Sequence, residues 1–203
     1  DIKACVGEID ACIECWNKSL ILWDQLRDRK SVSRLHVKMA YGFWEVAGDK
    51  DKASEHHRMA LEILEKMPES VELASLYEDI AHMLWRTGEL AEALPWAQKA
   101  VELAERLGDP KVLAGCHSVL GMISMLSGEL EKASKYFEQG LKIAVENNCT
   151  EPAIRLYSNL SLFYYMTGEL QKMFENAQKG SELAKKVGAV EWIAFNDYWL
   201  AAS

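Results

Sequence analysis

The feature that most constrains this chain is a repeat with a period of 40 residues. The tetrapeptides that begin at Thr87, Ser127 and Thr167 share the pattern Thr/Ser-Gly-Glu-Leu and stand 40 positions apart. Gly48 and Asp49 continue the series toward the N-terminus. A fixed period of this length indicates units that stack on one another and share a continuous core, because one such unit cannot bury its apolar side alone.

Each unit has the pattern of two helices. Small side chains recur 5 and 12 positions after the turn glycine, and a leucine or isoleucine recurs 15 positions after it. These spacings return to one face of a helix. Between the turn glycines stand Gly108, Asn148 and Gly188, residue types that accept the left-handed conformation ending a helix. We expect no strands, and helices near 8–28, 31–46, 50–66, 70–86, 89–107, 110–126, 129–146, 151–166, 169–187 and 190–202.

These columns resemble the tetratricopeptide repeat (TPR) family. That family has an aromatic and a small residue on the first helix of each unit, a glycine at the turn, and two alanines on the second helix. The period of 40 exceeds the family's 34, so the helices are expected to be longer. Forty-residue units are similar to those of kinesin-light-chain and LGN-type adaptors and of bacterial signalling regulators. The matching residues are Tyr77, Ala81, Gly88, Ala93 and Ala100, then Gly121, Gly128, Ala133, Phe137 and Gly140, and then Tyr157, Tyr164 and Gly168.

The resemblance implies an all-α fold: an α-solenoid, coiled as a right-handed superhelix, of about five antiparallel helix pairs. We expect one helical-repeat domain over residues 1–203. Since the chain does not begin with Met and ends within a repeat, we expect it to be a fragment of a larger protein. The predicted units are a half repeat at 1–28, full repeats at 31–66, 70–107, 110–146 and 151–187, and a half repeat at 190–203.

The resemblance also implies that the first helix of each unit lines a concave groove. Transferred by register, the groove residues are Glu78, His82, Trp85, Arg86, Ser118, Met122, Met125, Arg155, Ser158, Leu162, Tyr165 and Tyr198, with Ser75, Gly115, Leu126, Met166 and Phe195 beside them. In the first full unit Gly42 makes the register ambiguous by one residue. The candidates there are Leu35, Lys38, Gly42 and Glu45.

A groove of this kind predicts a binding function. Methionine is an adaptable contact residue, and Trp, Tyr and Arg are the usual anchors of binding energy. We expect a non-enzymatic scaffold that binds a partner protein or peptide, acidic or amphipathic, in the concave groove. An alternative stays open: a sensory or oligomerisation domain of a larger signalling protein (an ATPase, a cyclase or a transcription regulator) whose ligand is a small molecule or a second copy of the chain.

Composition excludes other classes of partner. The chain has 23 basic and 31 acidic residues, a net charge of −8, and its longest basic cluster, at 27–30, is interrupted by Asp28, so nucleic acid is not expected. No apolar run is long enough to span a bilayer, so no membrane partner is expected. Five cysteines, an odd number, do not form a disulfide framework, and we expect reduced thiols and a cytoplasmic protein.

No catalytic, metal or cofactor site is predicted. Cys12 and Cys15 have metal-like spacing, but no further ligand pair accompanies them, so packing is the favoured interpretation. His56 and His57 are expected to be a solvated pair. His82 stands one turn after Glu78 and could titrate near neutral pH, although an ordinary polar contact is favoured. The glycines form no phosphate loop, and no catalytic triad is suggested by spacing.

Overall fold

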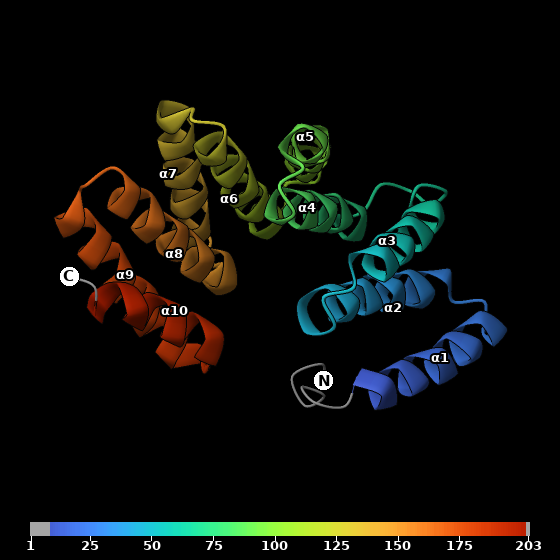
Figure 1. Ribbon diagram of the computed structural model, residues 1–203. Helices are drawn as coiled ribbons and strands as arrows, with labels where there is room; N and C mark the ends of the chain where they lie inside the picture. The colour runs from blue at the N-terminus through green and yellow to red at the C-terminus, as the bar shows by residue number, and fades with distance from the viewer. Residues whose placement is uncertain (1–8, 202–203) are drawn as a thin grey trace.

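The computed structural model describes residues 9–201, and within this range every regular element is helical (Figure 1). The helices follow the predicted segments closely, and the 40-residue repeat corresponds to one antiparallel helix pair. The elements are α1 (Ile9–Gln25), α2 (Arg29–Tyr41), the π-helical η2 (Gly42–Val46), α3 (Lys50–Leu64), α4 (Val71–Arg86), α5 (Leu90–Leu107), α6 (Pro110–Leu126), α7 (Leu130–Glu146), α8 (Thr150–Met166), α9 (Leu170–Val187) and α10 (Val190–Ala201).

The helix pairs stack into an arch (Figure 1). The first helices of successive units, α4, α6, α8 and α10, pack side by side, and each second helix packs on its own first helix. Such stacking buries a continuous core while leaving one curved face open. The architecture is therefore the α-solenoid that the repeat predicts.

The repeated Thr/Ser-Gly-Glu tripeptide ends one helix and starts the next. Gly88 has a φ of +87°, and the backbone N–H of Glu89 then donates to the carbonyl of Leu84 at 2.9 Å. The hydroxyl of Thr87 donates to that same carbonyl, also at 2.9 Å. Glycine is needed because the positive φ is strained for other residues. Asn148 likewise has a φ of +54°, which confirms the second set of predicted helix ends.

The first unit contains one extra residue, which is accommodated by η2. The N–H of Asp49 bonds to the carbonyl of Phe43, six residues back, whereas Glu89 reaches five residues back. This insertion explains the ambiguous register of the first unit. Leu35 and Gly42 are both buried, and Gly42 lies against the Trp16 ring, so their prediction as groove residues is wrong.

The core depends on small residues where helices cross. Ala93, Ala97 and Ala100 have no exposed surface, and Gly121 leaves room for the Phe137 ring. Met173 occupies an alanine column in the last full unit and is also fully buried in the core. Close helix approach at these positions explains why the period is visible in the sequence.

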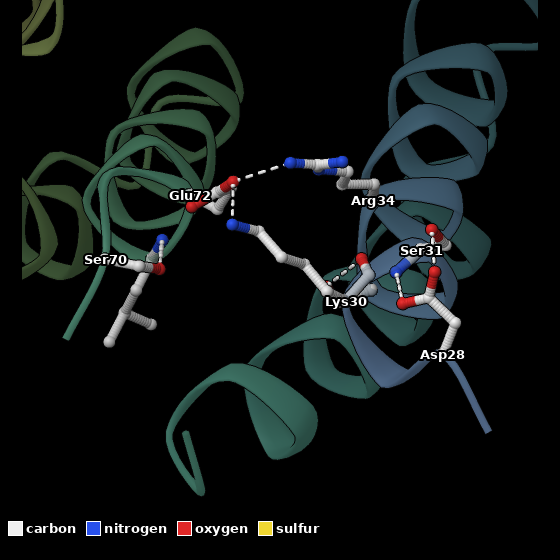
Figure 2. Close-up of polar contacts among 8 residues, drawn as sticks. Asp28, Lys30, Ser31, Arg34, Ser70 and Glu72 are labelled. Carbon is white, nitrogen blue, oxygen red and sulfur yellow. Dashed lines mark hydrogen bonds and ion pairs between the residues drawn. The ribbon is translucent and has the colours of Figure 1, made fainter. Parts of the chain in front are cut away.

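Ion pairs join the first unit to the second (Figure 2). Glu72 on α4 accepts from Lys30 Nζ at 2.7 Å and from Arg34 Nη2 at 2.8 Å, both on α2. These two bonds lower the pKa of Glu72 to about 2. Two further pairs, Arg86–Glu45 and Lys50–Glu89, span the same junction. These ion pairs accompany an apolar contact across the same junction, where Met83 of α4 belongs to one core cluster with Leu35 and Met39 of α2.

The histidines and cysteines depart from two predictions. His57 is buried, and His56 stacks on Phe43 with its Nδ1 3.0 Å from Nδ1 of His36, so the pair is not simply solvated. Cys12 is buried and disulfide-bonded, so the expectation of reduced thiols is wrong there. Cys15 is a free thiol, and Cys5 lies outside the described residues. Among residues 9–201 no helix is long and apolar enough to cross a membrane.

Candidate functional site: the concave face

The twelve predicted groove residues differ in how deeply they are buried. Arg86, Tyr165 and Tyr198 are exposed. Glu78, His82, Trp85, Arg155 and Leu162 are partly buried, and the remaining four, Ser118, Met122, Met125 and Ser158, lie in the packed interior. Those four do not reach the surface because the neighbouring first helix covers them, so we leave them out of the candidate contact surface.

The centre of the concave face is crossed by an ion pair that skips one helix. Glu78 on α4 accepts a hydrogen bond from Arg155 Nη2 on α8, 77 residues further along the chain. The pair passes over Gly115 on α6, where an added Cβ would lie 2.5 Å from Glu78 Oε1 and 2.7 Å from Arg155 Nη2. Both charged side chains are mostly buried, with exposed fractions of 12% for Glu78 and 23% for Arg155. Gly115 therefore creates the space in which the two charges meet.

Two amide–hydroxyl contacts connect neighbouring first helices in the same region. Asn159 Nδ2 on α8 donates to Ser118 Oγ on α6 at 2.8 Å. Asn196 Nδ2 on α10 donates to Ser158 Oγ on α8 at 2.8 Å and to the carbonyl of Trp192 at 2.7 Å. Since buried polar groups need partners, these contacts fix the spacing of α6, α8 and α10. The predicted serines are thus structural contacts.

The electrostatics of the groove follow from burial. Burial, with the charges of Arg155 and Arg86, lowers the pKa of His82 to about 3, so its titration near neutral pH is excluded. The pKa of Asp79, the next residue after Glu78, is raised to about 7 by burial within the arch and by the charge of Glu78. The Asp79 side chain is nevertheless exposed to solvent.

Apolar side chains remain exposed at the C-terminal ends of the first helices. Leu126 on α6 and Met166 on α8 occupy equivalent places in successive units, Tyr165 precedes Met166 on α8, and Tyr41 on α2 and Tyr198 on α10 are exposed near the ends of their helices. Tyr165 is 51% exposed and Tyr198 64%. We call these five residues, Tyr41, Leu126, Tyr165, Met166 and Tyr198, the apolar ledge. An exposed row of large apolar side chains on one face of a repeat protein is the usual character of a contact surface.

Three tryptophans border the ledge with unused hydrogen-bond donors. The buried indole N–H groups of Trp44, Trp85 and Trp199 have no acceptor. Trp199 is only 7% exposed and packs against Tyr165 and Tyr198, with ring centroids 5.1 Å apart in each case. Buried donors without acceptors are costly.

Sequence reasoning missed several residues of this face. The one-residue insertion in the first unit shifts the register, so the repeat did not predict Tyr41 as a residue of this face. Asp79 falls between two register positions, and its proximity to α8 depends on the curvature of the arch. Asn159 and Asn196 gave one usable signal: asparagine is a poor helix former, so its presence within an apolar helix points to a specific partner. Within residues 9–201 no group of three or more potential metal ligands is found.

The stacked pairs and their open concave face define the chain as a helical-repeat solenoid. Residues 72–144 match the family model described as Tetratricopeptide repeat. This segment therefore carries the tetratricopeptide repeat, in agreement with the pattern of its sequence. A comparison with the sequences of curated proteins gives no match.

Solved structures with the same fold include bacterial and archaeal regulators. Aspartyl phosphate phosphatase F from Bacillus subtilis is 19% identical with a TM-score of 0.75, and the match covers 92% of this chain and 49% of that one. A signal transduction ATPase (STAND) with a tetratricopeptide repeat sensor, from Pyrococcus horikoshii, is 21% identical with a TM-score of 0.65, covering 96% and 31%. The Rap conjugation gene regulator of plasmid pLS20, solved in complex with a peptide, is 16% identical with a TM-score of 0.63, covering 83% and 53%. The chain spans about half the length of the phosphatase, and at these identities the likeness shows the fold alone.

Proposed function

We propose that this chain is a non-enzymatic interaction module that binds an extended peptide segment along its concave face. The observation that carries the proposal is the apolar ledge, where Leu126 and Met166 stay exposed at equivalent positions of two units, with exposed Tyr165 beside Met166, although the surrounding groove is closely packed. A peptide laid along the ledge would cover these side chains. Such burial of exposed apolar side chains by an extended peptide is a common mode of peptide recognition.

A structural neighbour supports this mode of binding. The Rap regulator that shares the fold was solved with a peptide bound. In the chain described here, the polar centre of the groove is already satisfied by internal contacts, such as the one between Asn159 and Ser118. The exposed ledge is therefore the part of the concave face that is free to contact a partner.

Binding of short peptides to ledge variants tests the proposal. An immobilised array of short synthetic peptides, with basic, acidic and uncharged sets built on a common apolar spacing, is incubated with the purified chain. We expect the Tyr165→Ser, Met166→Ser double variant to bind the selected peptides at least about tenfold more weakly, while its thermal unfolding is unchanged. Val145→Ser, which removes an exposed apolar side chain from α7, is the matched control. Equal binding by the ledge variant and the control would overturn the proposal.

A second candidate is a regulatory part of a longer signalling protein. The chains of the phosphatase and of the STAND protein extend well beyond the region shared with this chain. In such a protein the groove would sense an effector for a neighbouring domain. The gene sequence on either side of residues 1 and 203 tests this idea, since a nucleotide-binding or DNA-binding domain there would favour it.

A further inference from the structure

The helices at the two ends of the arch each lack one of the partners that an internal helix has. α1 has the register of a second helix, and α10 has the register of a first helix. Within residues 9–201 no first helix precedes α1 and no second helix follows α10, and the two stand at opposite ends of the arch (Figure 1). The missing partner of each end is therefore of the kind that the other end presents.

α1 exposes apolar positions that are buried in the other second helices. Leu22 stands 41 positions before Ile63 and 81 before Leu103, because the extra residue of the first unit lies between them. Leu22 is 59% exposed, whereas Ile63 is 7% exposed and Leu103 only 2%. Ile63 lines one cavity with Val32 of α2, the first helix of its own unit, and α1 has no such helix beside it. Leu26, also apolar, is likewise exposed at the end of α1.

α10 exposes the side on which an internal first helix meets the next one. Tyr198 occupies the column of Ser118 and Ser158, which are 1% and 0% exposed, but it is itself 64% exposed. The two serines face the following first helix, since Ser118 accepts from Asn159 of α8 and Ser158 contacts Asn196 of α10. The Tyr198 column therefore points to where a further first helix would pack.

The residues at this column need not be small. Glu78 occupies it on α4, and its side chain reaches over α6 to Arg155 on α8. A tyrosine in the same place on α10 can likewise lie over a following helix. Ala201, also exposed, continues the column of Gly121, which leaves room for the Phe137 ring of the second helix α7.

The charges of the two ends are complementary. α10 has two acidic residues, Glu191 and Asp197, and no basic ones, whereas α2 has no acidic residues and four basic ones, Arg29, Lys30, Arg34 and Lys38. Glu191 and Lys30 occupy the same position in their units as Lys111 and Glu151, which form an ion pair at 3.0 Å between α6 and α8. A contact between α10 and the α2 of another molecule would repeat that ion pair with the charges exchanged. Lys30 already contacts Glu72 and is still 44% exposed.

From these two ends we propose that the chain associates head to tail with a second copy of itself. α10 of one copy packs on α1 and α2 of the next, so α1 becomes the second helix that α10 lacks and α2 becomes the first helix that follows it. The junction thereby continues the interface that already joins the units within one chain. The contact covers Leu22 and Tyr198 and places Glu191 beside Lys30 of the second copy.

The proposed junction is independent of peptide binding. Tyr165 and Met166 lie on α8, inside the arch and away from both end helices. A head-to-tail contact uses different surfaces on the two copies, so growth continues beyond two copies unless a ring closes. A molecule with one blocked end can still use its other end.

The test is sedimentation velocity of the 203-residue chain at concentrations from about 5 to about 500 μM, a range that covers weak protein–protein contacts. We expect the sedimentation coefficient of the wild type to rise with concentration. Leu22→Glu and Tyr198→Glu each place a charge in the apolar contact, so each variant should associate at least about tenfold more weakly. Val145→Glu makes the same change at an exposed apolar position of α7 and should associate like the wild type. Since all three side chains are exposed, thermal unfolding should be the same for every variant.

A mixture of the two end variants identifies the geometry. The Leu22→Glu variant retains an intact α10, and the Tyr198→Glu variant retains an intact α1 and α2. An equimolar mixture should therefore form a dimer of one molecule of each variant and nothing larger, although each variant alone is a monomer. Glu191→Lys should also weaken the association of the wild type by about tenfold at low salt.

Three results would overturn the inference. The first is a wild-type chain that stays monomeric over the whole range. The second is association of Leu22→Glu or Tyr198→Glu that equals that of the wild type, which would place the contact elsewhere. The third is a mixture of the two variants that stays monomeric while the wild type associates, because a head-to-tail junction must form between their intact ends.

Discussion

Substituting alanine for Gly115 tests whether the ion pair over α6 dictates the residue beneath it. The new methyl group would lie 2.5 Å from Glu78 Oε1 and 2.7 Å from Arg155 Nη2, so the pair must separate. Breaking a buried pair costs about 3–5 kcal/mol, and the partial exposure of these side chains places the cost at about 2–3 kcal/mol. Alanine within a helix gains about 1 kcal/mol over glycine. The net expectation is a loss of about 1–2 kcal/mol in the free energy of unfolding.

The same substitution should have the opposite effect on the free energy of unfolding once the ion pair is absent. In a Glu78→Ala, Arg155→Ala background nothing crowds the new methyl group, so only the gain in helix propensity remains. There Gly115→Ala should stabilise the protein by about 1 kcal/mol. Urea unfolding followed by far-UV circular dichroism measures both differences. Stabilisation by Gly115→Ala in the wild-type background would refute the reasoning, because it would show that the pair does not require the glycine.

Three further predictions concern stability. Burial lowers the pKa values of His36 and His57 to about 4, so both histidines bind a proton more readily in the unfolded chain than in the folded one. The free energy of unfolding should therefore fall as the pH drops from about 6.5 to 4, by about 2 kcal/mol for each histidine at about pH 5. Thermal unfolding at several pH values measures this trend. Glu72→Gln removes the partly exposed contacts to α2 and should cost about 1 kcal/mol, and urea unfolding should show a smaller cost in high salt than in low salt. Asn196→Ala should cost about 1–3 kcal/mol and speed hydrogen exchange in α10, whereas equal exchange rates would show that its bond to Ser158 does not hold that helix in place.

Much of the fold could be predicted because its signals are local and recur. The turn glycines, such as Gly88, and the helix ends at Gly108 and Asn148 are chosen by backbone conformation, which acts within a few residues. Repetition then distinguishes these signals from chance. The insertion in η2 shows the limit of this reasoning, because a single extra residue shifts the register while leaving the composition of the helix unchanged.

The candidate site was less predictable because depth and pairing depend on distant residues. The register places Met122 and Ser158 on the correct side of their helices, but only the packing of α8 and α10 determines that they are buried. Glu78 and Arg155 both belong to the predicted groove. Their contact across 77 residues follows from the curvature of the arch and from Gly115, neither of which periodicity reveals.

The internal pairing of the groove also decides which ligands it can accept without cost. An acidic segment that recruited Arg155 would leave Glu78 buried and without a partner, a loss of about 3 kcal/mol or more before any new contact counted. A segment that contacts only the exposed apolar ledge would leave that ion pair intact. The ion pair between Glu78 and Arg155 therefore disfavours an acidic ligand at this place in the groove. Since it connects α4 to α8 directly, a peptide on the ledge should bind with little change in the curvature of the arch.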